Sequence, residues 1–369
     1  MVEVPLLPLE GFTVGVTADR RAAEQSELLR RRGAVVLAAP AMTTTYLGSD
    51  ERLRAATDDV LLRPPSHLVV TTAIGLRAWM EAAQSWGIDD ELLRCLADAG
   101  IVARGPKAAA AVQTFGLEVW RTASDERMQG VSDVLRTLSP RARVAVQCFG
   151  DDEHNILESL GGVVGDLVAI PVYRWEAPAD GRRLHGLVAA VLEGRVHAVT
   201  FTSAPAVRNL FAAAAAEGLA EPLRRSFNAG VVAACVGPAC AAVAHDAGID
   251  DPAAPEVGRL GLMVRALSDR LGATRRGFTL AGTPTEAQGN TLAVGDRHVA
   301  LTPREAGVLQ VLSEKPGAVA SAPTLLRRIW GGAGDDHAVG VTVGRLRRKL
   351  GTAGAAIVTV PRRGYRLEP

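Results

Sequence analysis

The feature that most constrains the fold of this chain is an internal duplication within residues 10–267. The segment from Val69 to Arg77 (VVTTAIGLR) matches the segment from Thr200 to Arg208 (TFTSAPAVR), with Thr71 and Thr202 131 residues apart. Three further pairs keep this spacing to within one residue: Gly105-Pro106 with Gly237-Pro238, Pro40 with Pro171, and Val14 with Val144. Four matches in the same order indicate two copies of one structural unit.

Each copy has the pattern of an α/β layered structure. Short apolar runs bounded by turn residues, at 14–16, 68–70, 144–146 and 198–201, are typical of buried parallel strands. Ligands in such folds bind beyond the carboxyl ends of strands, and here those ends carry Thr-Thr-Ala, Thr-Ser-Ala and two Gly-Pro segments. The helix after each Gly-Pro presents free N–H groups and a positive dipole end. One such turn needs no ligand to explain it, but two copies predict two walls that bind carboxylates or phosphates.

Composition narrows the class of protein. At 369 residues, with 48% apolar and 22% charged residues, the chain is expected to form two or three globular domains. We expect a cytoplasmic protein with no membrane contact, because no apolar run is long enough for a membrane helix and the N-terminus lacks a signal-peptide pattern. The four cysteines and the scattered histidines show no ligand spacing, so no metal site or cofactor is predicted. Residues 290–369 hold 12 Lys and Arg against 6 Asp and Glu, whereas the preceding 289 hold 29 against 34, which favours nucleic-acid binding by the tail.

The basic tail contains three predicted helices and a terminal hairpin. Thr302-Pro-Arg-Glu305 has the arrangement of a capping box, and Ser321 is expected to cap the second helix. The third helix places Val339, Val343, Leu346 and Leu350 on one apolar stripe. Its opposite face carries His337, Val341, Gly344, Arg345 and Arg348. Arginine can read guanine and valine can meet a thymine methyl, so this face is predicted to enter a DNA major groove.

This order of strands, three helices and a basic hairpin resembles the winged-helix effector domain of the response-regulator family that includes the phosphate and osmolarity regulators. The resemblance covers residues 277–369. It implies major-groove contacts through Val341, Thr342, Arg345 and Arg347, and wing contacts through Arg362, Arg363 and Tyr365. It also implies binding as a dimer on tandem half-sites of double-stranded DNA, and a loop that can contact RNA polymerase. The wing departs from the family pattern at Pro361, where an arginine is common.

The duplicated body resembles uroporphyrinogen-III synthase. The matching segments are Thr17 with Arg20, Thr71-Thr72-Ala73, Gly105-Pro106, Pro171-Val-Tyr173, Thr202-Ser203-Ala204 and Gly237-Pro238. The resemblance implies two α/β lobes, the first discontinuous: residues 1–40 and 174–267 in lobe 1, and residues 42–172 in lobe 2. A polar linker at 268–276 would then join the body to the winged-helix domain.

The same resemblance implies a site for hydroxymethylbilane, a linear tetrapyrrole with eight carboxylates. The residues expected to bind such a ligand are Thr17, Arg20, Thr71, Thr72, Gly105, Lys107, Thr202, Ser203, Gly237 and Cys240. Tyr173 matches the tyrosine that helps the substrate hydroxyl to leave, although an isolated tyrosine at a lobe junction is also typical of packing. Ala108 and Cys240 stand at two positions where the family carries a hydroxyl.

Two functions follow from this domain pair. A phosphoacceptor receiver needs an acidic cluster and a lysine at strand ends. Because the only lysine of the body, Lys107, lies in the Gly-Pro-Lys turn, the body is not expected to be such a receiver. We therefore expect a sequence-specific transcription regulator whose synthase-like body senses a tetrapyrrole or another polyanionic metabolite. The pair also resembles actinobacterial regulators of nitrate and nitrite assimilation, which implies control of that pathway. The alternative is a bifunctional uroporphyrinogen-III synthase that also binds DNA.

Overall fold

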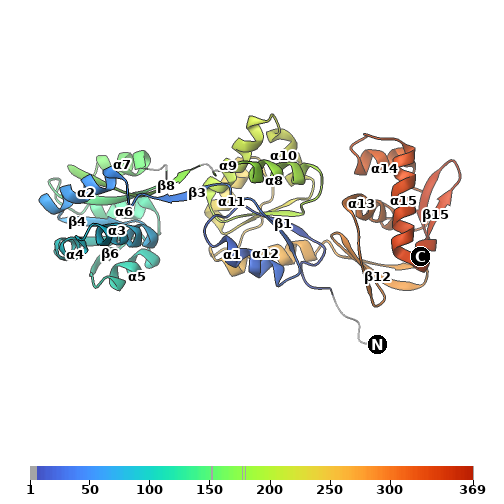
Figure 1. The fold of residues 1–369 in the computed structure, drawn as a ribbon, viewed down its shortest axis with the longest axis horizontal. Coiled ribbons are helices and arrows are strands. Elements are labelled where there is room, and N and C mark those ends of the chain that lie inside the picture. The colour runs from blue at the N-terminus through green and yellow to red at the C-terminus, as the bar shows by residue number, and fades with distance from the viewer. Residues whose placement is uncertain (1–5, 151–152, 177, 179, 369) are drawn as a thin grey trace. The chain divides into compact units, whose positions relative to one another are not determined.

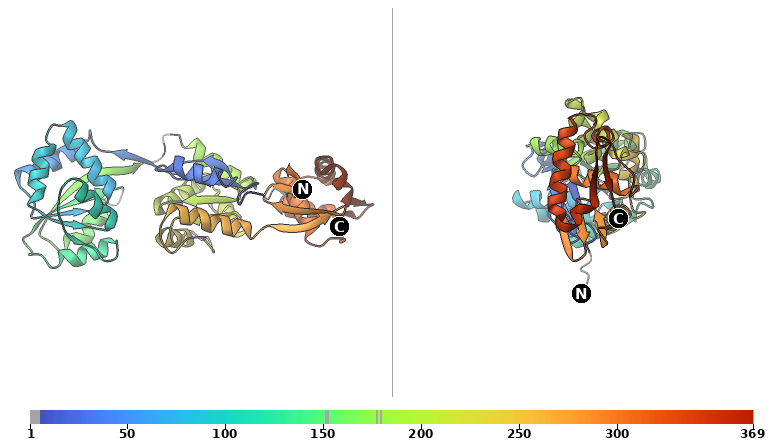
Figure 2. Two further views of the ribbon diagram at one scale, coloured as in Figure 1. Left: turned by 90° about the horizontal axis from the view of Figure 1, so that it is seen from below. Right: turned by 90° about the vertical axis from the view of Figure 1, so that its right-hand side faces the viewer.

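The computed structural model describes residues 6–150, 153–176, 178 and 180–368. The chain divides into two compact units. Unit 2 is Thr43–Glu176 and forms one α/β lobe, lobe 2; unit 1 comprises the chain before and after it, and contains lobe 1 and a C-terminal domain (Figures 1 and 2). Among the described residues, no helix is long and apolar enough to cross a membrane.

Lobe 2 is built on a six-stranded sheet in the order β3-β8-β7-β4-β5-β6. All neighbouring strands are parallel except β3, which pairs antiparallel with the end of β8. The strands are β3 (Thr43–Tyr46), β4 (His67–Val70), β5 (Gly100–Ala103), β6 (Val119–Thr122), β7 (Arg143–Phe149) and β8 (Asp166–Glu176). The helices are α2 (Glu51–Leu62), α3 (Ala73–Ser85), α4 (Asp89–Ala97), α5 (Pro106–Thr114), α6 (Met128–Leu135) and α7 (Glu153–Gly161).

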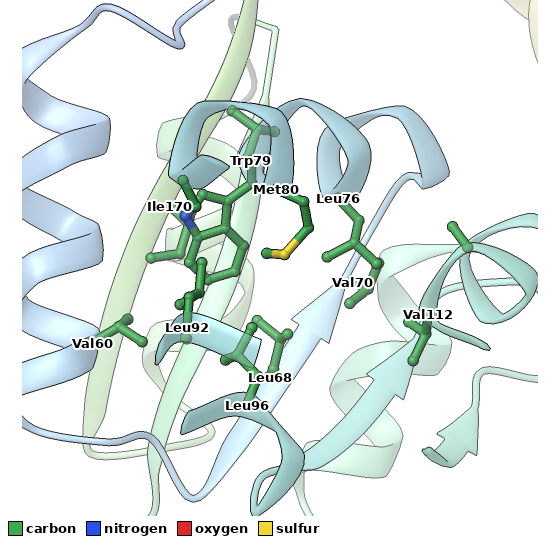
Figure 3. Close-up of a cluster of buried hydrophobic side chains, with 14 of the residues drawn as sticks. Val60, Leu68, Val70, Leu76, Trp79, Met80, Leu92, Leu96, Val112 and Ile170 are labelled. Atoms are coloured by element: carbon green, nitrogen blue, oxygen red, sulfur yellow. The ribbon is translucent and has the colours of Figure 1, made fainter. Parts of the chain in front are cut away.

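Both faces of the lobe 2 sheet are buried, as alternation along β4 shows. Leu68 and Val70 pack into a core with α2 to α5, whereas Val69 packs into a second core with α6 and α7. Trp79 is fully buried at the centre of the first core (Figure 3) and donates its indole N–H to Thr57 Oγ1 at 2.9 Å. A helix-covered sheet of this kind requires continuous apolar strands, which the sequence supplies.

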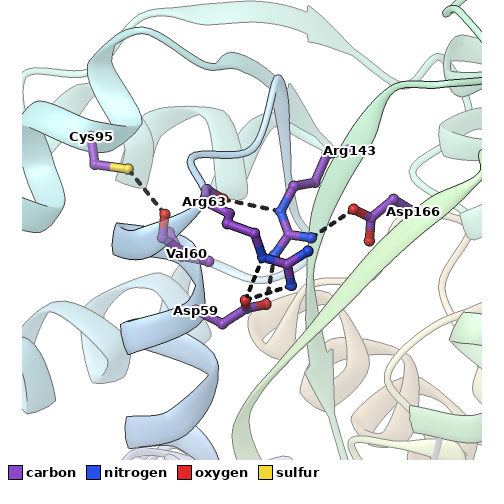
Figure 4. A network of polar contacts seen from close by, with 6 residues as sticks. All are labelled: Asp59, Val60, Arg63, Cys95, Arg143 and Asp166. Carbon is purple, nitrogen blue, oxygen red and sulfur yellow. Dashed lines mark hydrogen bonds and ion pairs between the residues drawn. The ribbon is translucent and has the colours of Figure 1, made fainter.

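An arginine clamp closes the amino-terminal edge of the same sheet (Figure 4). Arg143, at the start of β7, bonds Asp59 Oδ2 at 2.5 Å, Asp166 Oδ2 at 2.6 Å and the Arg63 carbonyl at 3.0 Å. Arg63 also bonds Asp59, and this contact with the guanidinium group lowers the pKa of the Asp59 carboxyl. The clamp connects α2 to β7 and β8 at the amino-terminal edge of the sheet. The predicted ligand residues lie at the opposite, carboxyl-terminal edge.

Lobe 1 is built on a parallel four-stranded sheet in the order β10-β9-β1-β2. Its strands are β1 (Thr13–Val16), β2 (Val35–Ala38), β9 (Ala198–Phe201) and β10 (Val232–Cys235). Its helices are α1 (Ala22–Arg30), α8 (Arg182–Leu192), α9 (Ala204–Ala216), α10 (Ala220–Asn228), α11 (Pro238–Asp246) and α12 (Leu260–Gly272). Two cores cover its faces, one containing α8 to α11 and the other α1 and α12.

The duplication is visible in the elements themselves. Helix α9 begins 131 residues after α3 and has the same length of 13 residues, and α10 begins 131 residues after α4 and has the same length of nine residues. The order β5-β4-β7-β8 in lobe 2 matches β10-β9-β1-β2 in lobe 1. Each lobe therefore combines the first strands of one repeat with the later strands of the other. The predicted pair of α/β lobes with a discontinuous first lobe is confirmed.

The C-terminal domain has an antiparallel sheet, three helices and a hairpin. The elements are β11 (Arg276–Leu280), β12 (Thr283–Gln288), β13 (Thr291–Val294), β14 (Arg297–Ala300), α13 (Pro303–Ser313), α14 (Ala322–Ile329), α15 (Asp336–Leu350), the 3₁₀ turn η1 (Gly351–Ala356), β15 (Ile357–Val360) and β16 (Gly364–Leu367). The predicted capping box is present at Thr302 and Glu305, and Ser321 caps α14. These features form the expected winged helix.

The predicted linker at 268–276 is wrong at both ends. Residues 268–272 continue α12, and β11 begins at Arg276, so that only 273–275 join the two elements. The reason is packing: Leu267 and Leu271 are buried in the lobe 1 core, and the helix extends far enough to bury both. The connection is therefore short and attached to folded structure on each side.

Candidate nucleic-acid interface and ligand site

Helix α15 separates a buried stripe from an exposed one. Its amino terminus is capped by Asp335, whose Oδ1 accepts the Ala338 N–H at 3.0 Å. The four residues predicted to face the core, Val339, Val343, Leu346 and Leu350, are all buried. A buried stripe of this kind fixes the rotation of the helix, so the identity of the outward residues is set by the same pattern.

The outward face of α15 offers groups suited to DNA. His337, Val341, Arg345 and Arg348 are exposed, and Val341 retains 37% of its surface. Thr342 is half-buried, and its hydroxyl donates to the Ala338 carbonyl at 2.9 Å. Two guanidinium groups beside an exposed valine can meet guanine edges and a thymine methyl in one groove.

Arg347 lies elsewhere, although the sequence assigns it to the same DNA-contacting set. Its Nε donates to the Ile357 carbonyl at 2.8 Å and its Nη2 donates to Thr359 Oγ1 at 2.9 Å. Its guanidinium group lies 5.9 Å from the ring centre of Tyr365. These contacts connect α15 to both strands of the hairpin, so Arg347 braces the wing.

The hairpin tip carries the two basic residues predicted for the wing. Arg362 and Arg363 are exposed between β15 and β16, and Arg362 adopts a positive φ of 62°. Tyr365 is half-buried under Arg347, and its backbone exchanges hydrogen bonds with Ala320. Gly364 is required next to it, because a Cβ there would overlap the Ala320 carbonyl oxygen. The tip can therefore reach a phosphate backbone while the tyrosine holds the base of the wing.

The carboxyl-terminal strand ends of lobe 2 bring together several predicted ligand residues. Thr71 is buried, and its hydroxyl donates to the Gln147 carbonyl at 3.0 Å. Thr72 caps α3 by accepting the Gly75 N–H at 3.0 Å. Gly105 is buried at the start of α5, whereas Lys107, two residues later, is exposed. The threonine hydroxyls are thus engaged in internal hydrogen bonds, whereas the Lys107 side chain is exposed near the start of α5.

Two polar residues at this edge were missed from the sequence. Arg104 directly precedes Gly105, and its guanidinium group lies 5.1 Å from the Phe149 ring centre and interacts with Tyr173 and Glu126. Burial lowers its pKa, although an arginine remains charged at neutral pH. Gln147 is fully buried, and neither side-chain polar atom has a hydrogen-bond partner among the described residues. The duplication offered the signal for Gln147, because it occupies the position of Thr17 in the other copy.

Tyr173 belongs to the packing of this edge. It is only 4% exposed, and its ring lies 5.8 Å from that of Phe149 and 6.3 Å from that of Tyr46. The interaction with Arg104 gives its phenol a cationic neighbour.

The equivalent edge of lobe 1 carries the remaining predicted ligand residues. Thr17 is buried and donates to the Thr200 carbonyl at 2.7 Å, and Ser203 caps α9 by accepting the Ala206 N–H at 3.4 Å. Thr202 is half-buried, Arg20 is exposed, and Gly237 is buried at the start of α11. Cys240 contacts the buried thiol of Cys235, and this contact together with burial raises the pKa of Cys235. Among the described residues, no cluster of three or more metal-ligating side chains occurs at either edge or elsewhere.

Comparison with known proteins assigns the body. Residues 23–264 match the family model described as uroporphyrinogen-III synthase HemD. A mutant uroporphyrinogen-III synthase from Thermus thermophilus has 27% identity and a TM-score of 0.57, covering 71% of this chain and 99% of that one. An uncharacterised protein of Bacillus subtilis, YjjA, is 26% identical over 264 residues, which is 70% of this chain and 96% of the relative.

The C-terminal domain has separate relatives. Residues 296–367 match the family model described as transcriptional regulatory protein, C terminal. The regulatory protein CutR of Streptomyces coelicolor is 48% identical over 73 residues, which is 19% of this chain and 33% of CutR. CseB of the same organism is 36% identical over 121 residues, 28% of this chain and 51% of CseB, so the chain spans about half or less of each regulator. The chain thus belongs to the uroporphyrinogen-III synthase HemD family and carries at its C-terminus the winged-helix DNA-binding domain of OmpR/PhoB-type regulators.

Proposed function

We propose that this protein is a sequence-specific DNA-binding transcription regulator whose synthase-like body senses a polyanionic metabolite. The observation that carries the DNA-binding part is the open face of α15. Val341, Arg345 and Arg348 are exposed in the folded chain, on a helix whose other face is fully buried. The regulator families that match this domain support the same output.

The polar groups of lobe 2 support an anionic ligand. A helix N-terminus begins at Gly105, and Arg104 beside it is a half-buried cation. Carboxylates satisfy both kinds of donor. A tetrapyrrole bearing several carboxylates is the ligand that the family assignment favours.

A map of the bound genomic DNA is the test of the output, because it names both operator and regulated genes. Control of nitrate and nitrite assimilation predicts enrichment next to genes of that pathway, whose nitrite reductase uses siroheme made from uroporphyrinogen III. The mapped duplexes then allow fluorescence anisotropy. We expect Arg345→Ala to weaken a specific duplex by about 1–3 kcal/mol and to relax its sequence preference. Equal binding by wild type and variant would refute the assignment of Arg345 to the major groove.

A titration with uroporphyrin III, a stable porphyrin with eight carboxylates, is the test of the input. We expect the full chain to bind it, and Arg104→Met to weaken binding by about tenfold, because removing one charged hydrogen-bonding group costs on the order of 1.5 kcal/mol or more. Arg141→Met is the control: it removes an exposed cation that precedes β7, at the opposite edge of the same sheet. Equal losses in both variants would indicate a general attraction of charge, and no binding by wild type would reject this ligand class.

The alternative is a synthase that also binds DNA, and the electrostatic interaction between Tyr173 and Arg104 favours it. Conversion of hydroxymethylbilane to the type III isomer at an enzyme-like rate, abolished in Tyr173→Phe, would establish that activity. Committed threonine hydroxyls, and Ala108 and Cys240 in place of hydroxyl residues, favour the sensor. The same proposal includes the pairing of two chains on tandem half-sites, which is tested by the stoichiometry of binding to one-site and two-site duplexes. It also includes contact of the loop at 331–335 with RNA polymerase, which is tested by a polymerase pull-down.

A further inference from the structure

The hairpin turn between β12 and β13 is held against lobe 1 by main-chain and amide hydrogen bonds. Gln288 is fully buried, and its Nε2 donates to the Leu7 carbonyl at 2.8 Å and to the Glu10 carbonyl at 2.7 Å. The Asn290 N–H donates to the Gly11 carbonyl at 2.8 Å. One side-chain amide and one backbone amide thus join segments of the chain that lie far apart in the sequence.

The fit at this contact leaves no room for side chains. Gly11 has a φ of +79°, and a Cβ there would overlap the Gln288 carbonyl oxygen. Gly289 has a φ of +53°, and a Cβ there would lie 2.6 Å from the Gly11 carbonyl oxygen. Two glycines facing each other in this way mark a close backbone approach that any other residue would force apart.

Side chains extend the contact on both sides. His298 Nδ1 lies 2.8 Å from Glu10 Oε1, and the other oxygen of that carboxylate accepts the Leu7 N–H at 3.1 Å. The Asn290 side chain is hydrogen-bonded to the ring of His197, whose Nδ1 accepts the Thr13 N–H at 3.0 Å. We call the set Leu7, Glu10, Gly11, His197, Gln288, Asn290 and His298 the joint.

The joint lies at the amino-terminal edge of the lobe 1 sheet, and two strands lead from it to the opposite edge. Strand β1 begins at Thr13, two residues after Gly11, and ends one residue before Thr17. Strand β9 begins directly after His197 and ends one residue before Thr202. Each strand is four residues long, or about 13 Å. A displacement of the backbone at the carboxyl-terminal end of either strand is therefore only one short strand away from the joint.

The joint leaves the DNA-reading surface open. It uses the β12–β13 turn, whereas Val341, Arg345 and Arg348 on α15 remain exposed in the same folded unit. The contact is therefore a positioning device and not a cover over the recognition helix.

We propose that the joint fixes the DNA-binding domain to lobe 1 as one body, so that the state of the β1 and β9 ends is transmitted to the DNA-binding domain. This inference deepens the proposed function and rests on it for its biological meaning. The mechanical part stands by itself, because it predicts that the β12–β13 turn opens only when lobe 1 does.

Hydrogen exchange of the Asn290 amide in the full-length protein tests the joint directly. We expect this amide to exchange as slowly as the amides of β9, and Gly11→Ala to accelerate it by about tenfold or more. Gly282→Ala is the matched control, because Gly282 has a φ of +78° and a Cβ added there would have no atom within 4 Å. Both variants carry the same backbone strain, and only Gly11→Ala meets the joint. Fast exchange in wild type, or equal acceleration in both variants, would overturn the proposal.

A second variant covers the case in which Gly11→Ala does not fold. Gln288→Leu substitutes an apolar side chain of similar size and removes both donors to Leu7 and Glu10, and it lies away from α15. We expect the same acceleration at Asn290, with the circular dichroism spectrum of wild type. Unchanged exchange at Asn290 in a folded Gln288→Leu protein would refute the joint.

Uroporphyrin III as a probe separates this inference from the proposed function. Bound porphyrin should alter Asn290 exchange in wild type and in Gly282→Ala but not in Gly11→Ala. Binding without any change at Asn290 in wild type would refute transmission. Absence of porphyrin binding would count against the proposed ligand, but hydrogen exchange in the unliganded protein would still test whether the joint exists. Absence of DNA binding would count against the proposed output alone.

Discussion

Replacing Arg347 with alanine should damage the wing before it affects any base contact. The side chain makes a hydrogen bond of 2.8 Å to the Ile357 carbonyl and one of 2.9 Å to Thr359 Oγ1, and its charge lies 5.9 Å from the Tyr365 ring centre. A charged hydrogen bond contributes roughly 1.5–3 kcal/mol when buried, and the half-buried first bond is worth about 1 kcal/mol. The exposed second bond and the ring contact add about 0.5 kcal/mol each.

The expected loss is therefore about 2 kcal/mol of local stability in the β15–β16 hairpin. This corresponds to roughly 30-fold faster exchange of the hairpin amides, because about 1.4 kcal/mol is a factor of ten. Exchange should be read at the paired residues Val358 and Arg366 in the full-length protein, because hydrogen-bonded pairs alternate along an antiparallel hairpin and the Tyr365 N–H donates to Ala320 instead. The hairpin amides report local opening, which global unfolding of the two lobes does not mask.

Arg345→Ala is the matched control, because it removes an exposed arginine from the same helix. It should leave hairpin exchange within about twofold of wild type, since exposed substitutions change stability by about 0.5 kcal/mol or less. It should instead weaken binding to a specific duplex. If Arg347→Ala leaves hairpin exchange unchanged and Arg345→Ala accelerates it, the assignment of bracing and reading roles is wrong.

Three further outcomes are expected. Thr57→Val leaves the buried Trp79 N–H without its acceptor, so the free energy of unfolding of lobe 2 should fall by about 1–3 kcal/mol in a urea titration; a loss below about 0.5 kcal/mol would mean that the indole finds another partner. Arg363→Ala should weaken binding to all duplexes and reduce the slope of log K against log salt by about 0.9, whereas a change confined to one sequence would place this residue on a base. Burial lowers the pKa of His197, so between that pKa and about 6.5 the unfolded chain binds more protons and stability must fall as pH falls. The melting temperature should therefore drop between about pH 7.5 and 5.5 and drop less in His197→Asn, which keeps an acceptor for the Thr13 N–H; an identical pH dependence in both proteins would contradict this role.

The repeat spacing and the amphipathic pattern of the tail were sufficient to predict the two α/β copies, the three helices of the tail and its terminal hairpin. The spacing of 131 residues identified α9 as the equivalent of α3 in the second copy. The apolar stripe at Val339 and Val343 predicted which side of α15 faces outward. These features are local: the period of a helix, the end of a strand and a capping residue each depend on a few neighbouring residues. They are therefore readable without coordinates.

The candidate site was only partly readable. Thr71, Thr72 and Gly105 were found because they recur, whereas Arg104 was missed because the other copy has Val236 at that position. The threonine hydroxyls looked available as ligand donors, but packing commits that of Thr71 to the Gln147 carbonyl. Whether a polar group is free or already bonded depends on residues that are distant in sequence.

The sequence by itself determined two α/β copies, a winged helix and the outward face of its third helix, because periodicity and capping act over a few residues. Only the tertiary structure decided that Arg347 braces the wing, that residues 268–272 remain helical, and that Gln288 meets Leu7 and Glu10. Those outcomes depend on which surfaces pack together, and a contact between residues 278 positions apart leaves no periodic trace in the chain.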